Sequence, residues 1–123
     1  MLENTKAYSG IAVHDLSDAR RFYGETLGLR TSEEYGLMWL HLADGRDTLV
    51  YEQPDATPAS FTILNFEVVD IDRAVDALAA RGVRFERYDD FEQDEKGIAR
   101  GEGPYIAWFK DPSGNILSVL QEK

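Results

Sequence analysis

The chain has 123 residues, of which 43% are hydrophobic and 11% aromatic, a composition typical of one folded globular domain. It contains no cysteine, which excludes structural disulfides, zinc–thiolate sites and thiol nucleophiles. A net charge of −10 repels phosphate backbones and anionic lipid surfaces, so we expect neither nucleic acid nor a membrane as a partner. No early apolar run resembles a secretory signal, and we therefore expect a cytoplasmic protein.

The first half of the chain predicts a strand, a helix and then three strands. Residues 7–13 alternate between apolar and other side chains, as a half-buried strand does. Asp15 is a suitable N-cap for a helix whose apolar residues recur at helical spacing until Gly28 ends it. Hairpin residues then separate three strand-like runs, at 29–35, 37–43 and 48–53.

The second half repeats this pattern after a proline-containing linker at 54–58. Asp15 recurs as Asp70, 55 residues later, whereas Gly28 recurs as Gly82, 54 residues later, so the repeat slips by one residue. We expect a helix between Asp70 and Gly82, with strands around it at 61–69, 83–88, 105–110 and 115–121.

This order is βαβββ twice, with repeats at about 7–54 and 60–121. It predicts a single α+β domain over 1–123, in which a curved, cup-shaped mixed sheet carries helices on its outer face. The acidic loop at 89–103 interrupts the second repeat. Such a loop is usually solvated, but its length also allows a mobile lid over a pocket.

Two short motifs strengthen this interpretation. The helix ends in Phe22-Tyr23-Gly24-Glu25-Thr26-Leu27-Gly28-Leu29, and the last two strands are joined by Asp111-Pro112-Ser113-Gly114-Asn115. With the βαβββ order, these motifs resemble the vicinal oxygen chelate superfamily. That group includes glyoxalase I, extradiol dioxygenases, fosfomycin-resistance transferases and bleomycin-binding proteins. The resemblance implies a cup-shaped site on the concave face of the sheet, usually within a homodimer.

Enzymes of this superfamily typically hold a divalent metal on His, Glu or Gln side chains at equivalent places in the two halves. Carried over to this chain, those places are Tyr8, Val50 or Tyr51, Ile63 and Ser118. None of these is a good ligand for a divalent ion, so we expect neither a metal nor another cofactor, and the chain resembles the metal-less, bleomycin-resistance-like branch. An improvised site of His41, Glu67 and Glu52 is a weaker alternative, because no ligand spacing supports it.

The remaining residues of the cup suggest how a ligand is held. Aromatic and aliphatic walls with a few polar groups are typical of small-molecule sites and suit a planar, hydrophobic or cationic ligand. The predicted ligand-binding residues are Tyr8, Trp39, His41, Glu52, Asn65, Glu67, Ile106, Trp108 and Ser118. Alternatively, the aromatic residues pack a dimer interface or close the cup completely.

Three functions follow from these observations. The leading hypothesis is a metal-free protein that binds and sequesters a hydrophobic or cationic natural product, as in antibiotic resistance. The second is a glyoxalase-like lyase, isomerase or dioxygenase that uses a displaced metal, or Glu67 or His41 as a general base. The third is an accessory domain without a small ligand. A Ser-His-Asp triad has no support, because we expect the fold to place the two histidines apart.

Overall fold

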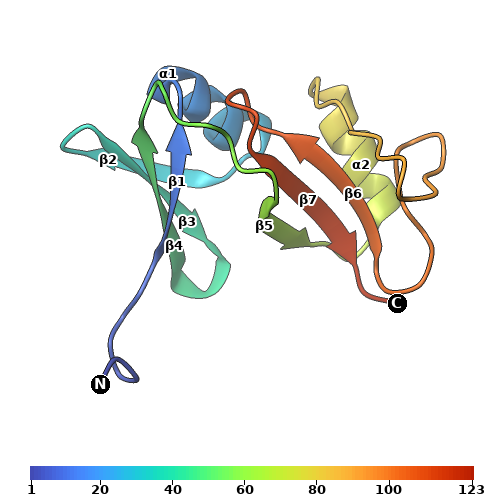
Figure 1. Cartoon of the computed structure of the whole chain (residues 1–123), viewed down its shortest axis with the longest axis horizontal. Helices are drawn as coiled ribbons and strands as arrows, with labels where there is room; N and C mark the ends of the chain where they lie inside the picture. Colours follow the sequence, from blue (N-terminus) through green and yellow to red (C-terminus); the bar gives the residue numbers. More distant parts are fainter. The chain divides into compact units, whose positions relative to one another are not determined.

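The chain folds into two compact units. The computed structural model describes all 123 residues, Met1–Lys123. One unit comprises Met1–Ala56 and the other Thr57–Lys123, so the boundary falls inside the predicted linker and each unit holds one repeat (Figure 1). The α+β class agrees with the sequence prediction, but the strands form two separate sheets, one in each unit, rather than one continuous sheet. That the whole of 1–123 forms one domain stays a prediction.

The first unit is a four-stranded sheet with one helical segment. Its elements are β1 Ser9–Val13, α1 Leu16–Ala19, η1 Arg20–Thr26, β2 Arg30–Glu34, β3 Leu37–Leu42, η2 Ala43–Gly45 and β4 Arg46–Glu52. The strand order is β1-β4-β3-β2, with β1 parallel to β4 and the other pairs antiparallel. Tyr35 and Gly36 form the β2–β3 turn with φ of 54° and 75°, as two-residue hairpin turns require.

The two faces of this sheet differ in burial. Met38 and Leu40 are fully buried, whereas Trp39 and His41, which alternate with them, are half-buried. The helical segment packs against the buried side of the sheet, since α1 contacts β4 and η1 contacts β2. Its other core residues are Ile11, Val13, Ala19, Tyr23 and Val50.

The first helix begins at its predicted N-cap. The Asp15 carboxylate accepts a hydrogen bond from the Asp18 N–H at 2.9 Å. Glu52 Oε1 accepts a second bond, from the Leu16 N–H at 2.8 Å. Two of the N–H groups that a helix start leaves without a partner are therefore satisfied by carboxylates.

Most of this first helix is a π-helix rather than the predicted α-helix. The π-helix covers Arg20–Thr26, and its wider winding continues in the bond from the Leu27 N–H to the Phe22 carbonyl, five residues back, at 2.9 Å. Tyr23 is fully buried within it. The helix still stops where expected, with Gly28 at φ 75°.

The second unit is a three-stranded sheet with one α-helix. Its elements are β5 Thr62–Glu67, α2 Ile71–Ala80, β6 Tyr105–Lys110 and β7 Ile116–Gln121. The order is β5-β7-β6, with β5 parallel and β6 antiparallel to the central β7. No helix of the chain is long and apolar enough to cross a lipid bilayer.

The start of α2 repeats that of α1. Asp70 caps it by accepting a hydrogen bond from the Arg73 N–H at 3.2 Å, as predicted. Gln121 Oε1, from the last strand of the unit, accepts from the Ile71 N–H at 2.9 Å. The helix buries Ile71 and Val75 and contacts β6 and β7. The sheet residues of this core are Ala107, Phe109, Leu117 and Val119.

The predicted strand at 83–88 is wrong. Only Phe85 makes a β-bridge, to Phe109, and the Glu86 N–H bonds to the Trp108 carbonyl at 2.8 Å. Pairing with β6 stops there because the Tyr88 N–H donates instead to the Gln93 side chain, at 2.8 Å. The segment therefore turns into the following loop instead of continuing along the sheet.

Candidate functional site

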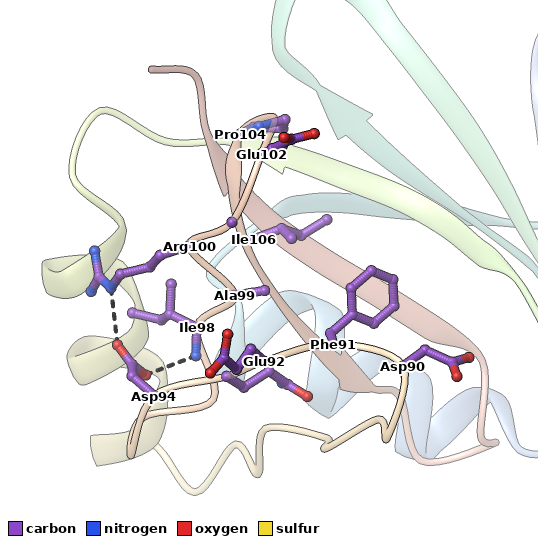
Figure 2. Close-up of a pocket in the computed structure, with 12 residues that line it drawn as sticks. Asp90, Phe91, Glu92, Asp94, Ile98, Ala99, Arg100, Glu102, Pro104 and Ile106 are labelled. Atoms are coloured by element: carbon purple, nitrogen blue, oxygen red, sulfur yellow. Dashed lines mark hydrogen bonds and ion pairs between the residues drawn. The ribbon is translucent and has the colours of Figure 1, made fainter.

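A cavity of about 500 Å³ lies between the acidic loop and β6 in the second unit (Figure 2). The loop at 89–103 supplies most of its wall and Ile106 of β6 supplies another part. Its lining residues are Asp90, Phe91, Glu92, Gln93, Asp94, Ile98, Ala99, Arg100, Gly101, Glu102, Pro104 and Ile106. Whether the loop moves as a lid stays a prediction.

Hydrogen bonds to Asp94 hold the loop in shape. One carboxylate oxygen accepts from the Ile98 N–H at 2.9 Å, and the other accepts from Arg100 Nε at 3.0 Å (Figure 2). The first oxygen also accepts from the Lys96 N–H at 2.9 Å. Partial burial raises the pKa of Asp94, but the hydrogen bonds from Ile98, Arg100 and Lys96 outweigh it and hold that pKa below its ordinary value. Ile98 is fully buried, so this part of the loop is packed rather than solvated.

The two cations of this region are already paired with α2. Arg100 Nη2 donates to Asp72 at 2.7 Å, and Lys96 Nζ lies 3.0 Å from Asp76. These carboxylates raise the pKa of both cations: for Lys96 the hydrogen bond to Asp76 is the main cause, and for Arg100 the bond to Asp94. The loop is thereby anchored to the helix, and its positive charge is neutralised there.

Three carboxylates of the cavity wall have no ion-pair partner in the protein. Asp90, Glu92 and Glu102 line the cavity, are exposed, and form no ion pair. Exposed carboxylates beside a cavity attract cations from solution.

Aromatic side chains form the apolar part of this region. The Phe91 ring lines the cavity and lies 4.8 Å from the Trp108 ring, tilted by 40°. Trp108 also meets the Tyr88 ring edge-on at 5.4 Å. Trp108 is only 8% exposed, whereas Phe91 is 50% exposed and can contact a ligand.

Five residues predicted from the sequence lie on one face of the second sheet. The register pairs Trp108 with Ser118 and Ser118 with Asn65, while Leu120 pairs with both Ile106 and Glu67, so these side chains share that face. The Ser118 hydroxyl donates to Asn65 Oδ1 at 2.6 Å. Ile106 belongs both to this face and to the cavity. That these residues bind a ligand stays a prediction.

The first unit places the other four predicted residues in two groups. Tyr8 meets the Trp39 ring edge-on at 4.7 Å, and His41 lies on the same face of β3 as Trp39. Glu52 lies on the opposite face of the sheet, alternating with Tyr51, and its carboxylate caps the helix start. A metal site of His41, Glu67 and Glu52 therefore has no geometric support within the first unit.

The positions that correspond to metal ligands elsewhere do not fit a metal here. Tyr51 shares the face of Asp47 and Leu49, whereas Val50 is fully buried on the other face, so the uncertain position is Tyr51. Ile63 has no donor atom, and the hydroxyl of Ser118 already donates to Asn65. The chain has no group of three or more His, Asp or Glu side chains arranged to hold an ion.

The sequence gives no support for a Ser-His-Asp arrangement, but the structure contains one around His41. The His41 ring lies between two side chains, with Nε2 at 2.7 Å from Ser32 Oγ and Nδ1 at 3.1 Å from Asp47 Oδ1. Ser32 comes from β2, His41 from β3 and Asp47 from β4. The separation of the two histidines could not reveal this arrangement, because it needs only one histidine. The strand register is what brings the three residues together.

Phe91 and the carboxylates near it were missed as site residues. The signal available in the sequence was the acidic loop itself, with Asp90, Glu92 and Asp94 close to the exposed Phe91. The contact of this loop with β6 depends on the β-bridge from Ala99 to Ile106, and a second bridge from Ala99 to Gln93 closes the loop on itself. No local sequence pattern indicates either bridge.

Comparisons with known proteins agree with this fold. The family model described as "Glyoxalase/Bleomycin resistance protein/Dioxygenase superfamily" matches residues 7–119. No curated protein matches the chain significantly. Among solved structures, a glyoxalase family protein from Enterococcus faecalis has 20% identity and a TM-score of 0.68, with 98% of this chain and 99% of that one covered.

Two further structures are similar to the same extent. The fosfomycin resistance protein FosX from Mesorhizobium loti has 14% identity and a TM-score of 0.69, with 100% of this chain and 95% of that one covered. TnmS3, an antibiotic binding protein from Streptomyces sp. CB03234, has 21% identity and a TM-score of 0.68, with 98% of each chain covered. At these identities the likeness shows the fold alone. The family match covers nearly the whole chain, which therefore belongs to the Glyoxalase/Bleomycin resistance protein/Dioxygenase superfamily.

Proposed function

We propose that this protein binds and sequesters a small hydrophobic or cationic natural product, in the manner of a bleomycin-resistance protein. The cavity of about 500 Å³ beside Phe91 is the observation that carries the proposal. Its volume is within the range of about 300–1,000 Å³ that is usual for small-molecule sites. The fold likeness to TnmS3, an antibiotic binding protein, is consistent with it.

The chemistry of the wall selects the ligand class. An exposed aromatic ring favours stacking with a planar group, and the unpaired carboxylates of Asp90, Glu92 and Glu102 favour a positive charge. The neighbouring sheet face, with exposed Asn65 and Glu67, would offer further contacts beyond Ile106. A planar aromatic cation combines both preferences.

Isothermal titration calorimetry with three acridine-sized compounds tests this proposal. We expect proflavine, a planar cation, to bind more tightly than a neutral or an anionic analogue of the same size. Phe91→Ala and Glu92→Gln should each weaken that binding about three- to thirtyfold, the range expected for one aromatic or ionic contact. Glu95→Gln is the matched control, since Glu95 is an exposed carboxylate of the same loop that does not line the cavity. Binding no tighter than millimolar for all three compounds would contradict the proposal.

A homodimer and a cytoplasmic location belong to the same proposal. The family resemblance implies the dimer, and the cysteine-free sequence suits a reducing compartment. Sedimentation velocity at micromolar concentration should give about twice the mass of 13.9 kDa for one chain.

The alternative function is a glyoxalase-like lyase, isomerase or dioxygenase. The fold likeness to FosX favours it, whereas the poor ligands at Tyr51, Ile63 and Ser118 oppose a metal at the usual place. Elemental analysis of protein purified without chelator separates the two functions. Stoichiometric Fe, Mn, Ni or Zn would favour the enzyme.

A further inference from the structure

We propose that Ser32, His41 and Asp47 form a catalytic triad that gives the first unit a second activity, the hydrolysis of small esters with an aromatic or apolar group. This activity is independent of ligand binding in the second unit. It rests on the hydrogen bonds that connect these three side chains across three strands.

The hydrogen bonds determine which histidine nitrogen carries the proton. An ionised carboxylate can only accept, so the Asp47 oxygen at 3.1 Å requires a proton on Nδ1 of His41. In the neutral ring Nε2 then has a free lone pair, and the Ser32 hydroxyl at 2.7 Å donates to it. This is the arrangement in which a histidine acts as general base toward a serine.

The strand register makes this geometry a property of the sheet. His41 pairs directly with Asp47 across β3 and β4, while Ser32 pairs with Trp39, one step along the same face. In antiparallel sheets such direct and diagonal neighbours are close enough for their side chains to interact. Ser32 is exposed, and the side chains of His41 and Asp47 are 35% and 32% exposed, so a substrate can reach the hydroxyl.

The surroundings of Ser32 suggest the substrate class. Trp39, its register partner, is half-buried and meets the Tyr8 ring edge-on at 4.7 Å, which gives a flat apolar surface beside the hydroxyl. Arg30 pairs with His41 and stands two residues before Ser32, on the same face. Its positive charge would favour the negative oxygen that forms when the ester is attacked.

The reaction has two balanced steps. In the first, Ser32 Oγ bonds to the ester carbonyl carbon, its proton passes to His41 Nε2 and then to the departing alcohol, and the ester C–O bond breaks. In the second, water bonds to the acyl carbon, and its proton passes through His41 back to Ser32 Oγ as the serine–acyl bond breaks. The carboxylic acid leaves, and no oxidant or cofactor is consumed.

A fluorophosphonate tests the nucleophile directly. The serine oxygen displaces fluoride from phosphorus, which adds a defined mass to the intact protein. We expect one label, located at Ser32 by peptide mapping, and none in Ser32→Ala. The labelling rate should fall at least about tenfold in His41→Ala, because the general base is lost. Ser9→Ala is the matched control: Ser9 lies in the same sheet, but its hydroxyl meets Thr48 at 3.2 Å and no histidine.

Ester turnover gives the second readout. Hydrolysis of p-nitrophenyl butyrate should require Ser32 and His41 and proceed at the wild-type rate in Ser9→Ala. Asp47 positions the His41 ring, so Asp47→Asn should change the pH profile of labelling as well as its rate. Arg30, the other charged residue paired with His41, is retained in this variant, so the change in the profile can be attributed to Asp47. Labelling elsewhere than Ser32, no labelling, or an equal rate in folded His41→Ala, judged by circular dichroism, would overturn the proposal.

Discussion

The Ser118 hydroxyl donates a hydrogen bond to Asn65 Oδ1 at 2.6 Å and thereby links the parallel strands β7 and β5. The two partners differ in burial, since Ser118 is fully buried and Asn65 is exposed. Removing Asn65 and removing Ser118 should therefore lower the stability of the protein by different amounts. A buried donor left alone loses its hydration, whereas an exposed acceptor finds water.

We expect Asn65→Ala to destabilise the protein more than Ser118→Ala. The first leaves a buried hydroxyl without a partner and should cost about 1–3 kcal/mol, while the second should cost about 1 kcal/mol or less. Urea denaturation of both variants and of the double variant measures this. An equal or reversed order would show that Ser118 is hydrated in the native state.

Asp94→Asn should make the stability less dependent on pH. The folded-state pKa of Asp94 lies below its ordinary value of 3.8, so its stabilisation is complete above that value and is lost as the pH falls through the folded pKa. At pH 7 the variant should be less stable by about 1–2 kcal/mol, because hydrogen bonds to a charged group are lost. Urea denaturation at pH 7, 5 and 2.5 should show the deficit shrinking at the lowest pH. A constant deficit would mean that the charge of Asp94 is not responsible.

Gly97→Ala should disturb the cavity loop, whereas Gly101→Ala should not. Gly97 has a φ of 91°, and a Cβ there would lie 3.1 Å from the Phe85 Cβ, so alanine is both strained and crowded. The expected cost is about 1–3 kcal/mol. Gly101 belongs to the same loop and lines the cavity, but it has an ordinary φ and open space at its Cβ position. Thermal unfolding and proflavine titration should both separate the two variants, and similar behaviour would contradict the loop geometry.

Tyr88→Phe should leave the stability unchanged or raise it by up to about 1 kcal/mol. The Tyr88 hydroxyl is buried and has no hydrogen-bond partner. Burial, with a smaller effect of Glu86, raises the pKa of Tyr88, so the wild type also loses stability as the pH rises above the ordinary value of 10.0. Denaturation at pH 8 and pH 10.5 should show that the stability of the variant relative to the wild type is greater at the higher pH. A loss of stability at both would indicate a bound water on the hydroxyl.

Features set by neighbouring residues could be predicted from the sequence. The aspartate N-caps at Asp15 and Asp70 depend on local chemistry and are confirmed. The predicted strand at 83–88 does not form, because its pairing ends where the Tyr88 N–H donates to the Gln93 side chain, a contact made by the folded loop.

The serine–histidine contact could not be predicted for a related reason. Ser32 and His41 meet only because β2 and β3 pair with Ser32 opposite Trp39. A slip of one residue would move Ser32 to the other face, and the turn residues alone did not fix that register. The cavity likewise depends on a loop whose course is decided by contacts of Asp94 and Ala99.

The π-helix at Arg20–Thr26 accounts for the one-residue slip between the two repeats. Between Ala19 and Gly28 the chain has one residue more than between their counterparts Ala74 and Gly82, and this is the stretch that winds more widely. Since the extra residue is absorbed within the helix, the strands after it keep their places. Deletion of Gly24 is expected to return the segment to ordinary α-helix and make both copies the same length.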